Sequence, residues 1–202
     1  MRILLNGAAG RVGSVLGPAL AAGGHELVAL EADAEVMVDF TVPTSVVGNV
    51  LRALRSGLPC VVGTSGWEPG EVARVSLELG LPVFYAPNFA LGAVLMMRFA
   101  AEASRLFPAA AIVELHHATK LDAPSGTARA TAALMQGDVA IHSIRLPGLL
   151  AHQEVILGGP GETLTIRHDT SGREAFVPGV ELALSRLAGL PPGLTIGLDR
   201  LL

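Results

Sequence analysis

The stretch Gly7-Ala8-Ala9-Gly10-Arg11-Val12-Gly13 stands directly between a short apolar run, Arg2 to Asn6, and an apolar segment from Ser14 to Ala22. The run has the composition of a buried parallel strand, and the segment after the glycines predicts a helix. Glycines at this spacing allow a tight turn whose backbone amides approach a pyrophosphate at a helix N-terminus. The pattern predicts dinucleotide binding through Gly7 to Val12, although a plain tight turn would need the same glycines.

Strands and helices alternate five times over the first 90 residues. The further strands expected here are His25–Leu30, Val36–Phe40, Leu58–Gly63 and Pro82–Ala86, and the further helices are Thr44–Ser56 and Glu68–Leu79. This alternation predicts an α/β fold with a doubly wound parallel sheet. Right-handed crossovers then place the loops after the strands at one edge, where ligands bind.

After Gly92 the pattern changes, because several expected strands have no regular helices between them. These strands are Ile112–Leu115, His142–Arg145, Val155–Leu157 and Thr163–His168, and the helices are Ala93–Leu106, Thr127–Met135 and Phe176–Leu187. The pattern predicts a smaller α+β domain with a mixed or antiparallel sheet. We expect residues 1–90 and 175–202 to form a dinucleotide-binding domain, and residues 91–174 to form the second domain.

The composition excludes several classes of protein. The chain has 202 residues, of which 50% are hydrophobic and 16% charged, so it can bury a core and is not disordered. A net charge of -4 without a basic run argues against nucleic-acid binding. Prolines and glycines interrupt the longest uncharged stretch, Leu79 to Met97, so no membrane helix is expected there. The lone Cys60 fits a reducing compartment, and we expect a cytoplasmic protein.

Glu31 follows Gly13 by eighteen residues, at the end of the second expected strand. An acid at this place accepts hydrogen bonds from the adenosine ribose of a bound dinucleotide, although a solvated loop glutamate is the plainer reading. The next residues are Ala32 and Asp33, and an acidic pair repels a 2′-phosphate. The sequence therefore predicts that NADH is preferred and NADPH possible, with Arg11 offsetting part of the repulsion.

Two adjacent histidines and a lysine, His116, His117 and Lys120, lie within five residues at the end of an expected strand. Histidine is the side chain best suited to proton transfer near neutral pH. Lys120 is the only lysine beside 13 arginines, which indicates a site that needs a compact ammonium, unless chance alone placed it there.

The segment Pro124-Ser125-Gly126-Thr127 predicts the entrance of a helix. Ser125 can cap the helix, while the free amides of Gly126 and Thr127 form an anion site; the plainer reading is a capped helix alone. Together with His117 and Lys120, these residues could hold a substrate with two carboxylates.

The run from Glu114 to Ala128 resembles the signature of the dihydrodipicolinate reductase family, and the likeness extends over nearly the whole chain. Further similar segments are Asp39-Phe40-Thr41, Gly63-Thr64-Ser65-Gly66-Trp67, Ala86-Pro87-Asn88-Phe89 and His168 to Arg173. The resemblance implies a Rossmann-like sheet and a second domain that binds substrate and builds a homotetramer. It also implies an NAD(P)H-dependent oxidoreductase of lysine and diaminopimelate biosynthesis. Such an enzyme reduces 4-hydroxy-tetrahydrodipicolinate, via dihydrodipicolinate, to tetrahydrodipicolinate by hydride transfer followed by protonation.

The resemblance further implies roles for single residues. His116 would be the acid/base residue, and Lys120 would be a proton donor and a carboxylate ligand. His117 would bind the substrate beside the anion site of Ser125, Gly126 and Thr127. The nicotinamide side would be lined by Gly63, Thr64, Ser65, Ala86, Pro87, Asn88 and Phe89. No metal is expected. This chain departs from the family at Ala111, Ser65, Ala90 and the short loop Ala32–Glu35, none of which removes a residue assigned to proton transfer.

Two other functions remain open from the sequence. Another Rossmann oxidoreductase, such as an amino-acid dehydrogenase, would explain the glycine loop but not the cluster around Lys120. A non-catalytic NAD-sensing module would need the loop and Glu31 but no proton donors. We expect no catalytic role for His25, His142 and His152, whereas His168 belongs to a segment similar to the family.

Overall fold

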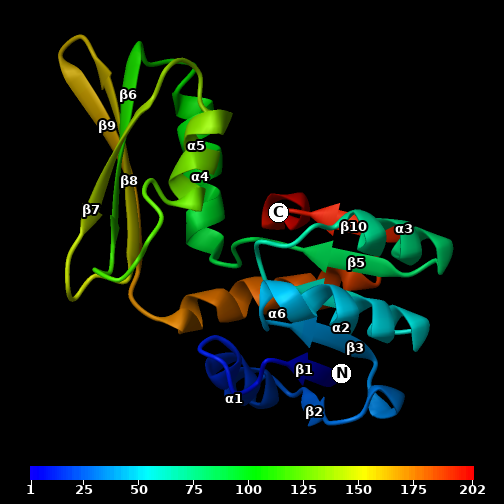
Figure 1. Cartoon of the computed structure of the whole chain (residues 1–202). Coiled ribbons are helices and arrows are strands. Elements are labelled where there is room, and N and C mark those ends of the chain that lie inside the picture. Colours follow the sequence, from blue (N-terminus) through cyan, green and yellow to red (C-terminus); the bar gives the residue numbers. More distant parts are fainter. The chain divides into compact units, whose positions relative to one another are not determined.

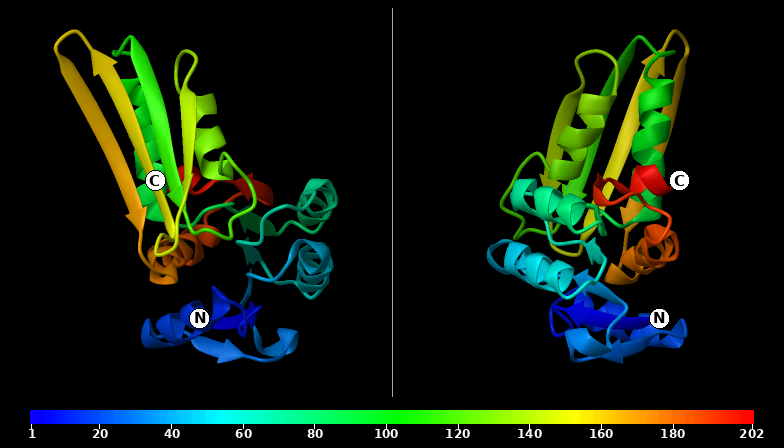
Figure 2. Two further views of the ribbon diagram at one scale, coloured as in Figure 1. Left: turned by 60° about the vertical axis from the view of Figure 1, so that its left-hand side comes forward. Right: turned by 90° about the vertical axis from the view of Figure 1, so that its right-hand side faces the viewer.

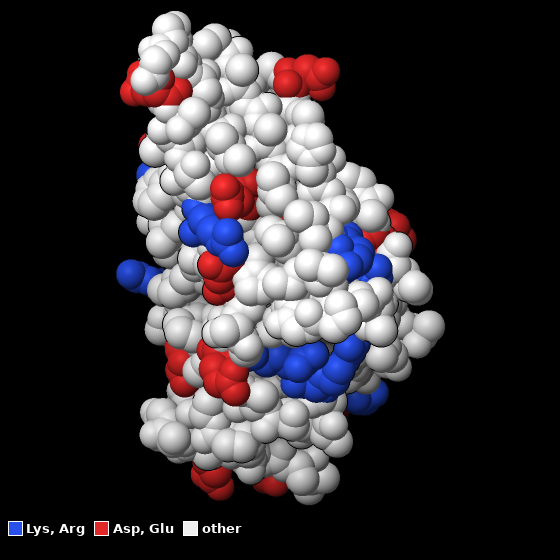
Figure 3. Space-filling model, turned by 90° about the vertical axis from the view of Figure 1, so that its left-hand side faces the viewer, with Lys and Arg blue, Asp and Glu red and all other residues white.

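The computed structural model describes residues 1–202, which form two compact units (Figure 1). Unit 1 contains Met1–Phe89 and Arg173–Leu202, and unit 2 contains Ala90–Gly172. No helix is long and apolar enough to cross a bilayer. The uncharged stretch from Leu79 to Met97 instead supplies a strand, a loop and the first part of a helix. On the face drawn in Figure 3, charged side chains lie in small separate groups within a mostly uncharged surface.

The sheet of unit 1 has six parallel strands in the order β10-β5-β4-β3-β1-β2. The strands are β1 (Arg2–Asn6), β2 (Glu26–Val28), β3 (Val36–Asp39), β4 (Cys60–Val62), β5 (Pro82–Tyr85) and β10 (Gly193–Ile196). The predicted doubly wound parallel sheet is confirmed. The strand order reverses between β1 and β3, and ligands bind at such a switch point in sheets of this kind.

Helices cover both faces of this sheet. They are α1 (Gly13–Ala22), α2 (Pro43–Arg55), α3 (Gly70–Glu78) and α6 (Val177–Leu187), with short 3-10 turns η1 (Glu31–Asp33), η2 (Arg173–Phe176) and η3 (Leu198–Leu201). Val50 and Leu54 of α2 pack against Met37 and Cys60 of the sheet. Side chains alternate along each strand, so Val38, also fully buried, faces the opposite layer.

One predicted element of unit 1 differs from the structure, and one strand of unit 1 was not predicted. The strand expected over His25–Leu30 is only three residues long, because the chain turns into η1 after Val28. The tail after Leu190 contains β10, which pairs with β5 and so forms an edge of the sheet.

The sheet of unit 2 has four strands in the order β7-β6-β8-β9. Its elements are α4 (Leu91–Ala103), β6 (Ala109–His116), α5 (Gly126–Leu134), β7 (Ala140–Arg145), β8 (Ala151–Gly159) and β9 (Glu162–Thr170). Strand β6 pairs parallel with β7 and antiparallel with β8, so the sheet is mixed, as predicted. Figure 2 shows α4 and α5 on one side of this sheet, where Ile112 and Val155 pack against Met96 and Ala128.

Candidate active site

The glycine loop joins β1 to α1 and is shaped by close backbone contacts. Gly7 has a φ of +85°, and a Cβ there would lie 2.4 Å from the carbonyl oxygen of Phe40. A Cβ on Gly13 would lie 2.1 Å from the carbonyl oxygen of Gly7. Both positions therefore require glycine for packing alone, so the glycines by themselves do not demonstrate a ligand.

Hydrogen-bond donors left open around this loop indicate what it can bind. Val12 occupies the N-cap position of α1, and no side chain caps the helix. The amides of Arg11, Val12 and Gly13 have no acceptor within the protein, whereas the Gly10 amide donates to Gly7, the Ser14 amide to Gly10, and the Val15 and Leu16 amides to Val12. The side-chain nitrogen of Asn6 is buried without a partner. These donors at a helix N-terminus fit the oxygens of a pyrophosphate.

Phe40 brings together several of the segments predicted to bind the cofactor. Its carbonyl oxygen packs against Gly7, and its ring packs so closely on Gly63 that a Cβ there would lie 2.1 Å away. The rings of Phe40 and Phe89 have centroids 5.5 Å apart. The loops after β1 and β4 and the segment Ala86–Phe89 therefore meet at one edge of the sheet.

Asp39, at the end of β3, holds the same edge together. Its buried carboxylate accepts hydrogen bonds from the Thr41 amide (3.0 Å), the Thr41 hydroxyl (2.7 Å), Thr64 Oγ1 (2.8 Å) and Asn49 Nδ2 (2.8 Å). Thr64 belongs to the segment expected beside the nicotinamide. Asp39 is not among the predicted site residues, although an acid at a strand end beside hydroxyl residues is a recognisable signal.

Glu31 does not lie beside the glycine loop. Its carboxylate accepts hydrogen bonds from Arg52 Nε (2.5 Å) and Ser56 Oγ (3.2 Å), in the last turn and at the C-cap of α2. Helix α2 starts beyond the carboxyl end of β3 and ends near its amino end, and Figure 1 shows η1 by that end of the helix. The predicted position is wrong because β2 ends at Val28 and the short connection to β3 turns back at once.

In unit 2, the side chain of Glu114 is fully buried on β6 and is surrounded by donors. Arg145 binds it with two nitrogens, Nη1 to Oε2 at 2.9 Å and Nη2 to Oε1 at 2.8 Å. The Ser125 amide donates to Oε1 at 3.2 Å, and His116 Nδ1 lies 2.5 Å from Oε2. Burial raises the pKa of Glu114, but the hydrogen bonds from Arg145, Ser143 and His116 outweigh it and lower the pKa to about 2.

His116 keeps an uncharged ring near neutral pH. Burial lowers its pKa, Glu114 raises it in part, and the charges of Lys120 and Arg145 lower it further, so the pKa lies below the ordinary histidine value. Because Nδ1 faces the Glu114 carboxylate, Nε2 is the nitrogen free for a substrate.

Lys120 lies on the segment between β6 and α5, and Arg145 also fixes this segment. Arg145 Nη2 donates to the carbonyl oxygen of Asp122 at 2.7 Å. Lys120 Nζ is 2.7 Å from Asp122 Oδ1, and this hydrogen bond lowers the pKa of Asp122. The Lys120 amide bonds to the His117 carbonyl oxygen (3.1 Å), and His117 Nδ1 lies 2.8 Å from Thr119 Oγ1. The predicted residues His116, His117 and Lys120 therefore belong to one connected cluster.

The entrance of α5 has the predicted form. Ser125 is buried and caps the helix, since its Oγ accepts from the Ala128 amide at 3.1 Å. The amides of Gly126 and Thr127 have no acceptor within the protein. They can donate to a carboxylate, while the Ser125 amide is already used by Glu114.

Three histidines outside this cluster have local partners. His168 packs against α4, where a Cβ on Gly92 would lie 2.5 Å from its ring, and burial lowers its pKa. His25 Nε2 lies 2.9 Å from Glu181, and His152 Nδ1 lies 2.7 Å from Asp169.

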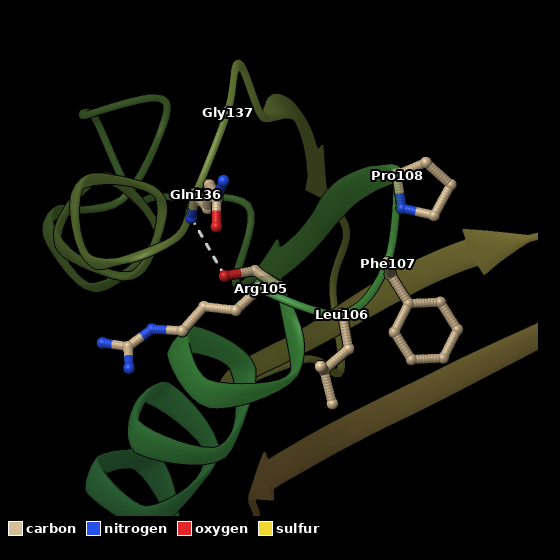
Figure 4. A pocket seen from close by; sticks show the side chains of 7 residues that line it. Arg105, Leu106, Phe107, Pro108, Gln136 and Gly137 are labelled. Atoms are coloured by element: carbon tan, nitrogen blue, oxygen red, sulfur yellow. Dashed lines mark hydrogen bonds between the residues drawn. The ribbon is translucent and has the colours of Figure 1, made fainter.

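A separate hollow of about 420 Å³ in unit 2 contains none of the predicted site residues. It is lined by Ser104, Arg105, Leu106, Phe107, Pro108, Gln136 and Gly137. Figure 4 shows Arg105 and Phe107 pointing to different sides, and the Gln136 amide donating to Ser104 Oγ at 2.9 Å. The hollow brings together no acid/base group and no second cation, so we do not assign the chemistry to it.

The fold of unit 1, with its open amides at the strand-order reversal, and the cluster of His116, His117 and Lys120 in unit 2 fit an NAD(P)H-dependent oxidoreductase. The chain belongs to the dihydrodipicolinate reductase family. Residues 20–89 match the family model described as dihydrodipicolinate reductase, N-terminus, and residues 92–202 match the model described as its C-terminus.

Curated relatives and a solved structure agree with this family. The chain is 43% identical to the 4-hydroxy-tetrahydrodipicolinate reductase of Beutenbergia cavernae, with 98% of this chain and 97% of that protein covered. It is 42% identical to the one of Streptomyces griseus subsp. griseus, with 100% and 98% covered. The dipicolinate-bound dihydrodipicolinate reductase from Paenisporosarcina sp. TG-14 superposes with a TM-score of 0.84 at 28% identity, covering 100% of this chain and 99% of that one.

The chain is shorter than these relatives because it lacks internal residues. The alignment with the Streptomyces griseus protein spans 245 positions and includes all 202 residues of this chain, so at least 245 − 202 = 43 positions have no counterpart here.

An amine dehydrogenase from Mycobacterium smegmatis superposes with a TM-score of 0.68 at 11% identity, which shows a shared fold alone.

Proposed function

We propose that this chain reduces 4-hydroxy-tetrahydrodipicolinate, after loss of water to dihydrodipicolinate, to tetrahydrodipicolinate in lysine and diaminopimelate biosynthesis. The observation that carries the proposal is the cluster in unit 2, where His116 and Lys120 accompany the free amides of Gly126 and Thr127. The relatives bear the name of this activity, and the solved structure of similar fold binds dipicolinate, a cyclic dicarboxylate.

The side chains of the cluster suit the two halves of the reaction. A reduced nicotinamide, when bound, supplies the hydride that adds to ring carbon 4 of the conjugated imine. Negative charge then develops on the adjacent carbon, where the Lys120 ammonium stabilises it. Lys120, or His116 once its Nε2 has taken up a proton, donates the proton that completes the reduction.

Substrate binding uses the positive groups of the same cluster. The amides of Gly126 and Thr127, together with His117, bind one carboxylate, and Lys120 binds the other. Lys120 is paired with Asp122 before substrate arrives, so a substrate carboxylate competes with Asp122 for the ammonium. Ser125 contributes by capping α5 and by keeping these amides pointing outward.

The cofactor is proposed to bind at the carboxyl edge of the sheet in unit 1. Gly7 to Val12 hold the pyrophosphate, and Gly63 to Ser65 with Ala86 to Phe89 line the nicotinamide side. NADH is expected to be the better cofactor, because the connection from β2 to β3 contains no Lys or Arg that would pair with the 2′-phosphate of NADPH. Arg11 in the glycine loop offsets part of this preference, since its cation could pair with a 2′-phosphate.

The proposal includes a homotetramer in the cytoplasm, as the family resemblance implies. Sedimentation equilibrium of the purified chain tests the tetramer, and a monomer at all concentrations would contradict it.

The activity is tested by the loss of reduced-nicotinamide absorbance. Substrate is generated in situ from pyruvate and aspartate semialdehyde by the preceding synthase, and NADH and NADPH are used in parallel. Rapid oxidation that requires the synthase supports the reductase. Cofactor binding without oxidation would contradict it and favour a non-catalytic NAD-sensing module.

A further inference from the structure

We infer that Glu114 and Arg145 form a positioning pair that fixes His116 with its proton on Nδ1, so that Nε2 exchanges a proton with the substrate. The role for Nε2 rests on the proposed function, whereas the position of the proton does not. Neither Glu114 nor Arg145 is a catalytic residue in this reading, because both act through His116.

The parallel pairing of β6 and β7 places the three side chains on one face. Glu114 and His116 are two residues apart on β6, and both share the face of the buried Ile112, which packs under the helices. Arg145 stands directly opposite His116 in the ladder. The neighbouring strand therefore carries the guanidinium that meets the carboxylate, 31 residues away in the sequence.

The hydrogen bonds of Glu114 decide which ring nitrogen carries the proton. Oε1 accepts from Arg145 Nη2 and the Ser125 amide, and Oε2 accepts from Arg145 Nη1 and lies against His116 Nδ1. An ionised carboxylate can only accept hydrogen bonds. Because a carboxylate paired with a guanidinium has no proton to donate, the hydrogen toward His116 comes from Nδ1 of the ring.

The same pair also orders the other half of the cluster. Arg145 Nη2 binds the carbonyl oxygen of Asp122, whose side chain binds Lys120. Glu114 binds the Ser125 amide at the entrance of α5. One buried ion pair thus connects the acid/base residue, the lone lysine and the helix terminus. A purely structural pair would connect the same segments without needing a particular proton position on His116.

The first test is nitrogen NMR of the full chain labelled with 15N-histidine. The expected spectrum gives His116 a protonated Nδ1 and an unprotonated Nε2 near neutral pH. In Glu114→Gln this preference is lost, because an amide can either donate to or accept from Nδ1. Asp169→Asn is the matched control, because it removes the carboxylate paired with His152 and changes the signals of His152 and the neighbouring His168 but not those of His116. A protonated Nε2 in the wild-type chain, or an unchanged tautomer in Glu114→Gln, overturns the inference.

The second test is the pH profile of turnover. We expect Glu114→Gln to lower kcat by about 10²-fold, with a smaller change in KM, because general acid–base catalysis loses its oriented group. Since Glu114 holds the pKa of His116 up, the substitution also moves the midpoint of the kcat profile to lower pH. Arg145→Lys keeps the positive charge but not the contact of two nitrogens with Glu114. We therefore expect a smaller loss of kcat, with the midpoint of the kcat profile nearly unchanged.

Folding defects are separated from positioning by a double variant. Glu114→Gln with Arg145→Gln leaves no unpaired buried charge, so it is expected to fold while turnover stays low. Recovery of wild-type turnover and of the wild-type pH profile in this variant overturns the inference. If the wild-type chain shows the expected tautomer but oxidises no NADH or NADPH, the proposed function fails and the proton position on His116 stands.

Discussion

The buried Glu114 carboxylate predicts a specific acid sensitivity of unit 2, which the substitution Glu114→Gln isolates. Glutamine has nearly the same shape but is neutral at every pH. It therefore removes the part of the stability that depends on the charge of Glu114. Arg145 loses its carboxylate partner in the variant, which adds a destabilisation that does not vary with pH.

The size of the pH-dependent part follows from the pKa shift. The pKa of Glu114 falls from 4.5 in the unfolded chain to about 2 in the folded one. Each pKa unit corresponds to about 1.4 kcal/mol, so the charged form stabilises the folded state by about 3 kcal/mol. The folded pKa is depressed. The stabilisation is therefore complete above the unfolded pKa and is lost as the pH falls from about 4.5 toward 2.

The assay is urea unfolding at several pH values between 7 and 2, followed by two probes. Far-UV circular dichroism reports on both units. Fluorescence of Trp67, the only tryptophan, reports on unit 1. We expect the stability gap between wild-type and Glu114→Gln in unit 2 to shrink by about 3 kcal/mol between pH 7 and pH 2. The Trp67 transition serves as the internal reference.

A matched control is Glu162→Gln, at an exposed glutamate that starts β9 in the same sheet. It is expected to change stability by less than about 0.5 kcal/mol. A gap for Glu114→Gln that stays constant from pH 7 to pH 2 would refute the reasoning, because the buried carboxylate would then have an ordinary pKa.

Three further outcomes are expected. Lys120→Arg lowers kcat by at least about 10²-fold, because a guanidinium is a poor proton donor of a different shape; near wild-type turnover would contradict this. Arg11→Ala weakens NADPH binding more than NADH binding, measured as two dissociation constants by quenching of Trp67; an unchanged ratio would show that Arg11 does not meet the 2′-phosphate. Gly13→Ala reduces dinucleotide affinity and destabilises unit 1 by about 1–3 kcal/mol, because the added Cβ would lie 2.1 Å from the carbonyl oxygen of Gly7. Gly126→Ala, where the Cβ enters open space, is the control in thermal unfolding, and an equal loss there would contradict the argument.

The doubly wound sheet could be predicted because its signal is local. Short apolar runs such as Val36–Asp39 are buried on both faces, and each is followed by a helix with its own apolar spacing. The mixed sheet of unit 2 was predicted for a similar reason, since strands and helices do not alternate regularly there and no helix separates β7, β8 and β9. Strand β10 was missed because proline and glycine precede it and its four residues are only partly apolar.

The candidate site was only partly predictable from the sequence. His116, Lys120 and Ser125 stand close together in the chain, so their type and spacing were enough to select them. Arg145 was missed because its partnership with Glu114 depends on the register of two strands, which no local pattern contains. Glu31 was placed wrongly for the opposite reason. Its spacing from the glycine loop is typical of a ribose ligand, but the length of the connection after it decides where it points.

The lone lysine has a practical consequence for chemistry on this protein. Lys120 and the N-terminal amine are the only primary amines in the chain. Amine-reactive reagents used for cross-linking, dye attachment or immobilisation on a sensor surface therefore have one side-chain target, and it lies in the candidate active site. Partial acylation followed by mass spectrometry counts modified sites directly, and protection by a dicarboxylate would show up as one missing mass increment. Conversely, a surface prepared through amines would hold the protein by a group of its candidate active site, so a tag that does not couple through amines is the safer attachment for binding studies.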